Sequence, residues 1–203
     1  MTKRMRSHPH AILFDLDGVL IESYPVWFHL LNHAARDLGY SEISTEAYEA
    51  SWGQTTRADR DAFFPNHEVA EVEAFYGAHY AEHFEHLVIP EGVPLVFRRL
   101  AELELPSAVC TNSQSALAAD AVKRAGATPT VLVGGDDVEL GKPAPDMLLR
   151  ACELLDVSPK NAWMIGDSRY DREASAAARV HFIGRGIDGD ARIEDLAELL
   201  ELI

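Results

Sequence analysis

The sequence predicts an α/β protein in which a parallel sheet carries helices on both faces and a small group of helices is inserted after the first strand. Three observations lead to this prediction. A short apolar run occupies residues 11–14, and from residue 93 onward similar runs alternate with helical patterns, as in parallel sheets. Between residues 22 and 88 the periodicity is helical and no convincing strand occurs. A chain of 203 residues is long enough for one domain with such an insertion.

The first apolar run, Ala11-Ile-Leu-Phe14, leads directly into Asp15 and Asp17. An unbroken apolar run of this length is typical of a strand buried on both faces. Because side chains alternate along a strand, we expect the two carboxylates to point the same way, and Gly18 allows a sharp turn beside a ligand. Two carboxylates this close repel each other unless a cation or a shared proton relieves them, and Mg²⁺ prefers oxygen ligands. Taken alone, the stretch is also compatible with a solvated acidic turn.

The segment that follows is expected to form a separate helical unit. Pro90 and Pro94 interrupt the chain strongly after it. We therefore assign residues 22–88 to the helical unit, and residues 1–21 and 89–203 to the domain that contains the sheet. Periodicity and capping residues predict helices at Tyr24–Leu38, from Ser44 onward and at Glu68–Leu87, with a loop entering a short helix over Trp52–Arg60.

Beyond the insertion, strands and helices alternate to the end of the chain. The expected strands are Ser107–Asn112, Thr130–Gly134, Ala162–Asp167 and Val180–Gly184. The expected helices are Leu95–Glu104, Ser115–Gly126, Asp146–Leu155, an alanine-rich helix before Val180, and a terminal helix from about Ile193 to Leu202.

Polar residues stand at the ends of these strands or at the start of the next helix. Thr111 and Asn112 offer a hydroxyl, an amide and backbone N–H groups that can hold phosphate oxygens, and Lys142 offers a compact positive charge. Asp167 can complete a site for a hard cation with the two aspartates of the first strand, and Asp171 can support it. Each feature alone is typical of an ordinary turn, loop or helix cap. Their joint occurrence, in order along the chain, favours one shared site.

With these residues the chain resembles the haloacid dehalogenase superfamily, in particular its phosphatases of the phosphoglycolate phosphatase type. The resemblance covers roughly residues 9–202, and the matching motifs are Asp15-Leu-Asp-Gly-Val-Leu20, Thr111, Lys142 and Gly166-Asp-Ser-Arg-Tyr-Asp171. It implies a Rossmann-like, three-layer core and identifies the helical insertion as a mobile cap over the site. One departure is Ala178-Arg179, where these proteins often carry a glycine before the last strand.

The resemblance also implies a reaction. The protein is expected to be a phosphoric monoester hydrolase that acts on a small phosphorylated metabolite, phosphoglycolate-like or a sugar phosphate, through an aspartyl-phosphate intermediate. In this scheme Asp15 is the nucleophile and Asp17 the general acid and base. Mg²⁺ is the expected cofactor, with Asp15, the backbone carbonyl of Asp17, and Asp167 as ligands and Asp171 in support.

The phosphoryl group is expected to be held by a second set of residues. Lys142 and Thr111 contribute to catalysis by stabilising the charge on its oxygens, and Gly18 and Asn112 join them in substrate binding. In the cap, Arg57 is the candidate that clamps a carboxylate or second anionic group of the substrate.

Other reactions of the same superfamily are less compatible with the residues. Asp17 argues against a dehalogenase, which in the family pattern lacks the second aspartate. Phosphonatases use a cap lysine, and none occurs between Lys3 and Lys123. β-Phosphoglucomutases usually carry a lysine shortly after the second motif, and residues 111–115 have none. A mutase of this type and a catalytically silent member that binds a phosphorylated ligand remain as alternatives.

The cap offers further candidate residues. Arg60 can belong to a solvated helix face as readily as it can contact the substrate. Trp52 is interpreted as an anchor of the cap's own core, and its ring can also stack on a substrate. The spacing of three histidines suggests a metal site: His79, His83 and His86. The sequence shows no fourth ligand for it. We therefore interpret them as surface residues of the cap helix.

The composition excludes some classes of function. A formal net charge of −15 argues against nucleic-acid binding through the phosphate backbone, but not against a small anionic substrate. Cys110 and Cys152 lie in apolar runs and are expected to be buried free thiols. Lys3, Arg4 and Arg6 precede the first strand, yet the aspartates interrupt the apolar run too early for a signal peptide, and no stretch is long enough to span a membrane. We therefore expect a soluble, cytoplasmic protein, and the sequence does not indicate an oligomeric state.

Overall fold

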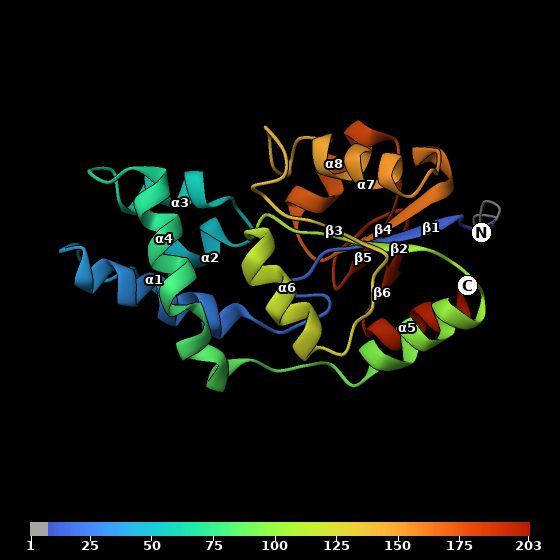
Figure 1. Ribbon diagram of the computed structural model, residues 1–203, viewed down its shortest axis with the longest axis horizontal. Coiled ribbons are helices and arrows are strands. Elements are labelled where there is room, and N and C mark those ends of the chain that lie inside the picture. The colour runs from blue at the N-terminus through green and yellow to red at the C-terminus, as the bar shows by residue number, and fades with distance from the viewer. Residues whose placement is uncertain (1–7) are drawn as a thin grey trace.

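The computed structural model describes residues 8–203, which form two bodies, a sheet-containing core and a smaller group of helices to its side (Figure 1). The basic residues of the amino terminus, Lys3, Arg4 and Arg6, lie outside the described residues. Within 8–203, no helix is both long and apolar enough to cross a membrane. The cytoplasmic location stays a prediction.

The core is built on a single six-stranded sheet in the order β3-β2-β1-β4-β5-β6. Every neighbouring pair of strands runs parallel, as the alternation of strands and helices predicts. The first strand therefore lies in the middle of the sheet, between β2 and β4. The strands are β1 (Ala11–Phe14), β2 (Ser107–Cys110), β3 (Val131–Val133), β4 (Ala162–Gly166), β5 (His181–Arg185) and β6 (Ala191–Ile193).

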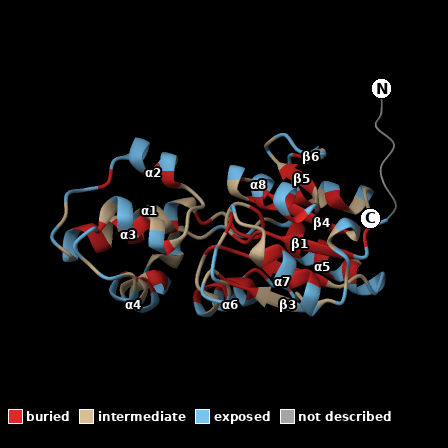
Figure 2. Cartoon of the chain, turned by 90° about the horizontal axis from the view of Figure 1, so that it is seen from above, coloured by how far each residue is buried: buried red, intermediate tan, exposed pale blue. Residues whose placement is uncertain are grey.

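Alternate side chains of each strand pack on opposite faces of the sheet, so the core has three layers. Ile12 and Phe14 belong to one apolar cluster, and Ala11 and Leu13 belong to another on the opposite face. Both clusters are fully buried, as the red core of Figure 2 shows. The first cluster is covered by α5 (Gly92–Glu102), α6 (Ser115–Arg124) and the 3₁₀ helix η3 (Leu196–Glu201), and the second by α7 (Asp146–Leu154) and α8 (Arg169–Ala178).

The second face also contains both cysteines. Cys110 of β2 and Cys152 of α7 are buried, free thiols, as predicted. Burial raises the pKa of the Cys152 thiol to about 11, so it stays in the neutral, unreactive form.

The helical body has an apolar core of its own, formed by residues such as Leu30, Phe64 and Tyr76. Aromatic rings pack closely in it, for example Trp27 against Tyr80 with ring centroids 5.0 Å apart. Its elements are α1 (Tyr24–Asp37), α2 (Thr45–Ser51), α3 (Thr56–Phe63), α4 (Val69–His79) and the 3₁₀ helix η1 (Tyr80–His86).

Two chain segments connect the bodies and lie side by side. Glu22 and Val88 exchange two backbone hydrogen bonds, of 2.8 and 3.3 Å. Arg185 of the core forms an ion pair of 2.6 Å with Glu22. The pairing occurs where the proposed helical unit, residues 22–88, begins and ends.

Two expected helices differ from the structure. The single helix expected at Glu68–Leu87 is wrong, because the α-helix ends at His79 and the chain continues as 3₁₀ helix. Histidine and aromatic residues have low helix propensity, and 3₁₀ turns are frequent at the ends of α-helices. The terminal helix expected from Ile193 is also wrong at its start, because Ile193 ends β6. This strand has only three residues, and only Ile193 is buried among them, which leaves no alternating pattern to detect.

The departure at Ala178-Arg179 has a local backbone consequence. Arg179 follows α8 in the left-handed conformation, with φ 60° and ψ 36°. Glycine is the residue that adopts this conformation most readily at a helix end, so an arginine here is strained. Arg179 stands at the opposite end of α8 from Asp171, so the strain is not placed at the carboxyl edge of the sheet.

The central position of β1 leads to a stability prediction. Leu13→Ala removes a fully buried side chain and is expected to lower the free energy of unfolding by about 2–5 kcal/mol. Leu95→Ala removes a leucine of α5 that is 43% exposed and should change it by less than about 1 kcal/mol. Urea denaturation of both variants measures the difference. Equal losses would contradict the placement of β1 in the core.

Candidate active site

Four chain segments meet at the carboxyl edge of the sheet. Asp15 follows β1, Thr111 follows β2, Asp167 follows β4, and Lys142 lies in the loop before α7. The ladder continues just past the strands, since the Asp15 N–H donates to the Ile165 carbonyl at 2.9 Å. Because β1 has β2 on one side and β4 on the other, the loops that follow all three strands are brought together. In open α/β sheets ligands bind in such a crevice.

Lys142 joins two of the carboxylates. Its Nζ lies 2.8 Å from Asp15 Oδ1 and 2.6 Å from Asp171 Oδ1, and the lysine side chain is only 2% exposed. Burial works against the charged form of this lysine, but the two carboxylates outweigh it and raise the pKa of Lys142 above its usual range. Lys142 is therefore a fixed positive charge at the sheet edge.

Asp171 is held by the first turn of α8. Its Oδ2 accepts hydrogen bonds from the N–H and the hydroxyl of Ser168, the former 3.1 Å long, and this forms a capping box. Gly166 makes room for it, because a Cβ at this position would lie 2.4 Å from the Asp171 Cβ. The motif Gly166–Asp171 thus fixes one carboxylate beneath Lys142.

Asp15, Asp167 and Asp171 together form what we call the acidic cluster. One carboxylate oxygen from each lies within 4.8 Å of the others. Burial, followed by the charge of Asp171, raises the pKa of Asp167 to about 7. Burial and the charge of Asp171 also raise the pKa of Asp15 well above its usual range, against the pull of Lys142. One lysine does not neutralise three carboxylates, and the raised pKa values of Asp15 and Asp167 reflect this need for further positive charge, from a proton or a cation.

The acidic cluster fits a hard divalent cation. Asp167 Oδ1 is shielded from solvent and has no hydrogen-bond partner among residues 8–203, which is costly for a buried oxygen unless an ion occupies the space. Gly18 lies directly against this carboxylate. A Cβ at Gly18 would lie 2.0 Å from Asp167 Oδ2, and the backbone there has φ +77°, so only glycine is compatible with this turn.

The Asp17 carboxylate is held apart from the acidic cluster by four donors. The Trp27 indole N–H donates to Oδ1 at 2.8 Å, and the Ser23 hydroxyl donates to the same oxygen. The hydroxyls of Thr111 and Ser113 donate to Oδ2, at 3.3 and 2.9 Å. Asp17 and Asp15 nevertheless line the same cavity.

Asn112 connects the helical body, which we call the cap, to the loop that contains Lys142. Its amide nitrogen donates to the carbonyl of Gly53 at 2.8 Å and to that of Lys142 at 3.0 Å, and its amide oxygen accepts from the Lys142 N–H. All its polar atoms are therefore engaged. Asn112 borders the cavity, but its contacts make it a positioning residue for Lys142.

The cap closes the cavity with aromatic and polar side chains. Trp52 lines it and places its indole N–H 3.4 Å from Asp167 Oδ2, while its ring packs against Tyr24 at 5.1 Å. Asp59 also lines the cavity and is buried. It accepts hydrogen bonds from Gln54 (2.7 Å) and from the Tyr76 hydroxyl (3.3 Å). Burial raises the pKa of Asp59 to about 7 despite these hydrogen bonds.

The two cap arginines lie elsewhere. Arg57 is exposed and borders a neighbouring groove together with Glu73 and Tyr170. Arg60 forms an ion pair of 3.0 Å with Asp61. Neither arginine is among the residues that line the cavity above Asp15.

Several cavity residues were not singled out as site residues from the sequence. Trp27 falls in the apolar pattern of the helix expected at Tyr24–Leu38, where its indole N–H gives no separate signal. Gln54 and Asp59 stand on either side of Arg57 in the sequence. Only the fold shows that these two residues, and not Arg57, line the cavity. Ser113 stands directly after Thr111 and Asn112, so its position at the same strand end is the signal that could have identified it.

The sequence and the fold of this chain are similar to those of known hydrolases. The haloacid dehalogenase-like hydrolase family matches the chain over residues 12–185. A phosphoglycolate phosphatase of Chromobacterium violaceum is 27% identical, and the alignment covers 97% of each chain. The validoxylamine A 7'-phosphate phosphatase of Streptomyces hygroscopicus subsp. limoneus is 30% identical over 92% of this chain and 89% of its own. The crystal structure of a β-phosphoglucomutase from Clostridium difficile superposes with a TM-score of 0.83 at 17% identity, over 94% of this chain and 93% of its own, and supports the fold.

The raised pKa of Asp59 leads to a prediction on stability and pH. Its pKa of about 7 in the folded protein lies above the ordinary value of 3.8, so between these values the folded state holds a proton that the unfolded state releases. This carboxyl therefore lowers the free energy of unfolding as the pH rises from about 4 to 7. Asp59→Asn removes the effect, so the variant should gain stability relative to the unmodified protein as the pH rises.

Urea denaturation at several pH values in this window measures the change. Asp61→Asn, in the same helix but with a side chain 60% exposed, is the matched control and should leave the pH profile unchanged. Parallel profiles of the Asp59→Asn variant and the unmodified protein would contradict the raised pKa.

Proposed function

The chain belongs to the haloacid dehalogenase-like hydrolase family, and from this membership and the geometry of the acidic cluster we propose that it is a Mg²⁺-dependent phosphatase of small phosphomonoesters. Its curated relatives include phosphatases over nearly its whole length. The observation that carries the proposal is the buried arrangement of Asp15, Asp171 and Lys142 beside the unpaired oxygen of Asp167. A phosphate ester needs both a nucleophilic oxygen and positive charge around it, and this arrangement supplies both.

In the first step a carboxylate oxygen of Asp15 attacks phosphorus. A bond forms between this oxygen and phosphorus while the bond from phosphorus to the ester oxygen breaks, which leaves an aspartyl phosphate. Lys142, 2.8 Å from the attacking carboxylate, stabilises the negative charge of the phosphoryl oxygens. Backbone N–H groups after Thr111 add further donors at the strand end.

Asp17 handles the proton. It protonates the leaving oxygen in the first step, and in the second it takes a proton from the water that attacks phosphorus and releases phosphate from Asp15. The hydrogen bonds from Trp27, Ser113 and Thr111 fix the orientation of this carboxylate at the cavity wall.

Asp15 and Asp167 are the proposed carboxylate ligands of Mg²⁺, with the backbone carbonyl of Asp17, while Asp171 supports the site through Lys142. When bound, the cation neutralises the repulsion between the Asp15 carboxylate and the phosphoryl group.

The cavity favours one class of leaving group. Among the residues that line it, Lys142 is the one with a positive charge, and both neighbouring carboxylates already engage it. The cap contributes Asp59, Gln54 and aromatic rings, which suit hydroxyl groups and the apolar faces of a sugar or cyclitol. A leaving group with its own carboxylate would meet Asp59 without a counter-ion. We therefore favour a sugar- or polyol-type phosphate over phosphoglycolate.

The reaction is tested by removing the nucleophile. Asp15→Asn should lower the rate of phosphate release by at least about a thousandfold, because the amide cannot attack phosphorus. Release from the unmodified protein should stop with a chelator and return with Mg²⁺. The control is Asp61→Asn, which should keep full activity. Substantial phosphate release by the folded Asp15→Asn protein would rule out this mechanism.

The substrate class is tested with a panel of phosphomonoesters. Ribose 5-phosphate, glycerol 3-phosphate and inositol phosphate should be hydrolysed with a kcat/KM at least about tenfold higher than phosphoglycolate and 3-phosphoglycerate, because the cavity lacks a partner for a second anion. Arg57→Ala should leave this order unchanged. Preference for phosphoglycolate that is lost in Arg57→Ala would show instead that the arginine reaches the substrate.

A further inference from the structure

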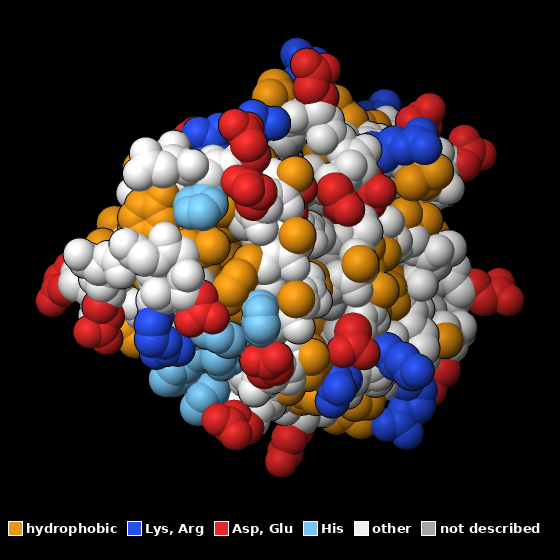
Figure 3. Space-filling view, turned by 60° about the vertical axis from the view of Figure 1, so that its left-hand side comes forward, with side chains coloured by type: hydrophobic (Ala, Val, Ile, Leu, Met, Phe, Trp, Pro, Cys, Tyr) orange, Lys and Arg blue, Asp and Glu red, His pale blue; other side chains and the backbone are white. Residues whose placement is uncertain are grey.

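A cluster of histidines joins two helices of the cap at a distance from the acidic cluster. Five of the nine histidines of the chain contact one another there, and Figure 3 shows histidine side chains gathered in one patch of the surface. His29 and His33 come from α1, and His79, His83 and His86 from the end of α4 and from η1. The last three, expected as surface residues, are half-buried because they pack against α1.

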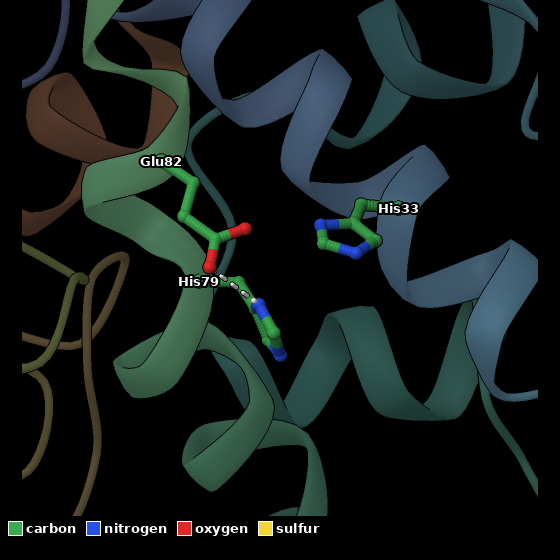
Figure 4. A group of neighbouring side chains, drawn as sticks. All are labelled: His33, His79 and Glu82. Atoms are coloured by element: carbon green, nitrogen blue, oxygen red, sulfur yellow. Dashed lines mark ion pairs between the residues drawn. The ribbon is translucent and has the colours of Figure 1, made fainter.

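Two histidines and a glutamate of this cluster converge on one point. His33 of α1, His79 of α4 and Glu82 of η1 each offer a ligand atom, and these atoms lie within 4.8 Å of one another. In Figure 4 the three side chains face a common space between the two helices. The set combines residues nearly fifty positions apart in the sequence, so the sequence spacing of His79, His83 and His86 alone does not reveal it.

One distance within the set is that of two ligands that share an ion. His79 Nδ1 lies 3.2 Å from Glu82 Oε1, and the ligand atom of His33 lies within 4.8 Å of both. Two ligands bound at about 2.1 Å to one ion, at tetrahedral or octahedral angles, are separated by about 3.0–3.4 Å.

One ligand atom of the set lacks a hydrogen bond within residues 8–203. His79 Nδ1 is shielded from solvent, and its contact with Glu82 lacks the alignment of a hydrogen bond. The net charge of −15 further favours the approach of a cation.

We propose that His33, His79 and Glu82 bind a first-row transition-metal ion, with Zn²⁺ as the representative case. Two imidazoles and one carboxylate, with water in the remaining position, are a common ligand set for Zn²⁺, whereas Mg²⁺ takes oxygen ligands. This cap site is therefore chemically distinct from the acidic cluster. The bound ion cross-links α1 to the junction of α4 and η1, the two parts of the cap that lead into the paired segments at Glu22 and Val88.

The experiment uses the full chain without an affinity tag, stripped of metal and kept in excess Mg²⁺ so that the acidic cluster is not available to the probe. Zn²⁺ is titrated by calorimetry, and Co²⁺ is titrated by its visible absorption, which reports nitrogen ligands. The expected result is one site per chain. His79→Gln and Glu82→Gln should each weaken Zn²⁺ binding by at least about tenfold and reduce the Co²⁺ absorption.

Two further variants make the result specific. His67→Gln is the matched control, because His67 also lies in the cap and contacts a glutamate, Glu71, at 3.5 Å. It should bind Zn²⁺ as the unmodified protein does, and so should Asp15→Asn. Glu82 is exposed and forms an ion pair with His79, so Glu82→Gln should fold normally even where a histidine variant does not.

Three results would overturn the proposal. They are no Zn²⁺ binding by the unmodified protein at about 100 μM, binding that Asp15→Asn abolishes, and binding that Glu82→Gln and His79→Gln leave unchanged. A rise in Tm with Zn²⁺ that Glu82→Gln abolishes would support it independently of any catalytic activity.

Discussion

The buried contact of Lys142 with Asp15 and Asp171 is the constraint on which the rest of the site depends. A charge removed from water is stable only when it is paired, and Lys142 supplies one positive charge to a group of three carboxyls. Lys142 pairs with Asp15 and Asp171, while Asp167 Oδ1 has no hydrogen-bond partner in the part of the chain that the structure describes. The surrounding chain is adapted to this imbalance: Gly18 and Gly166 have no Cβ where one would strike Asp167 or Asp171. The acidic cluster thus has the oxygen atoms and the space that a divalent cation requires.

Much of the core could be predicted because its determinants are local. An unbroken apolar run, such as residues 11–14, predicts a buried strand, and the carboxyl ends of parallel strands meet at one edge whatever the loops do. Residues at strand ends are therefore brought together by topology alone. Predictions were wrong where the local signal was weak. β6 has three residues and one buried side chain, and at the end of α4 the apolar and aromatic pattern continues into the 3₁₀ helix, so that Gly77 is the one local sign of the change.

The cap could not be predicted to the same depth, because its functional residues depend on packing between helices. Arg57 and Asp59 stand two positions apart, yet Arg57 is exposed and Asp59 is buried at the cavity wall. Residues two positions apart point to nearly opposite sides of a helix, so only one of the two can face the cavity. Which one does so depends on how α3 packs, and in the structure Gln54 and Tyr76 hydrogen-bond Asp59. His33 and His79 likewise meet only through the packing of α1 against α4.

Asp17 connects the two bodies chemically. Of its four hydrogen-bond donors, Ser23 and Trp27 stand at the start of the cap, and Thr111 and Ser113 belong to the core. A carboxylate held in this way has its full set of donors only when the cap lies against the sheet edge, because separation of α1 removes the two donors on Oδ1. The cavity above Asp15 is complete under the same condition, since Trp52 and Asp59 form its upper wall. The position of Asp17, the proposed general acid and base, and the exclusion of water therefore depend on the same contact between cap and core.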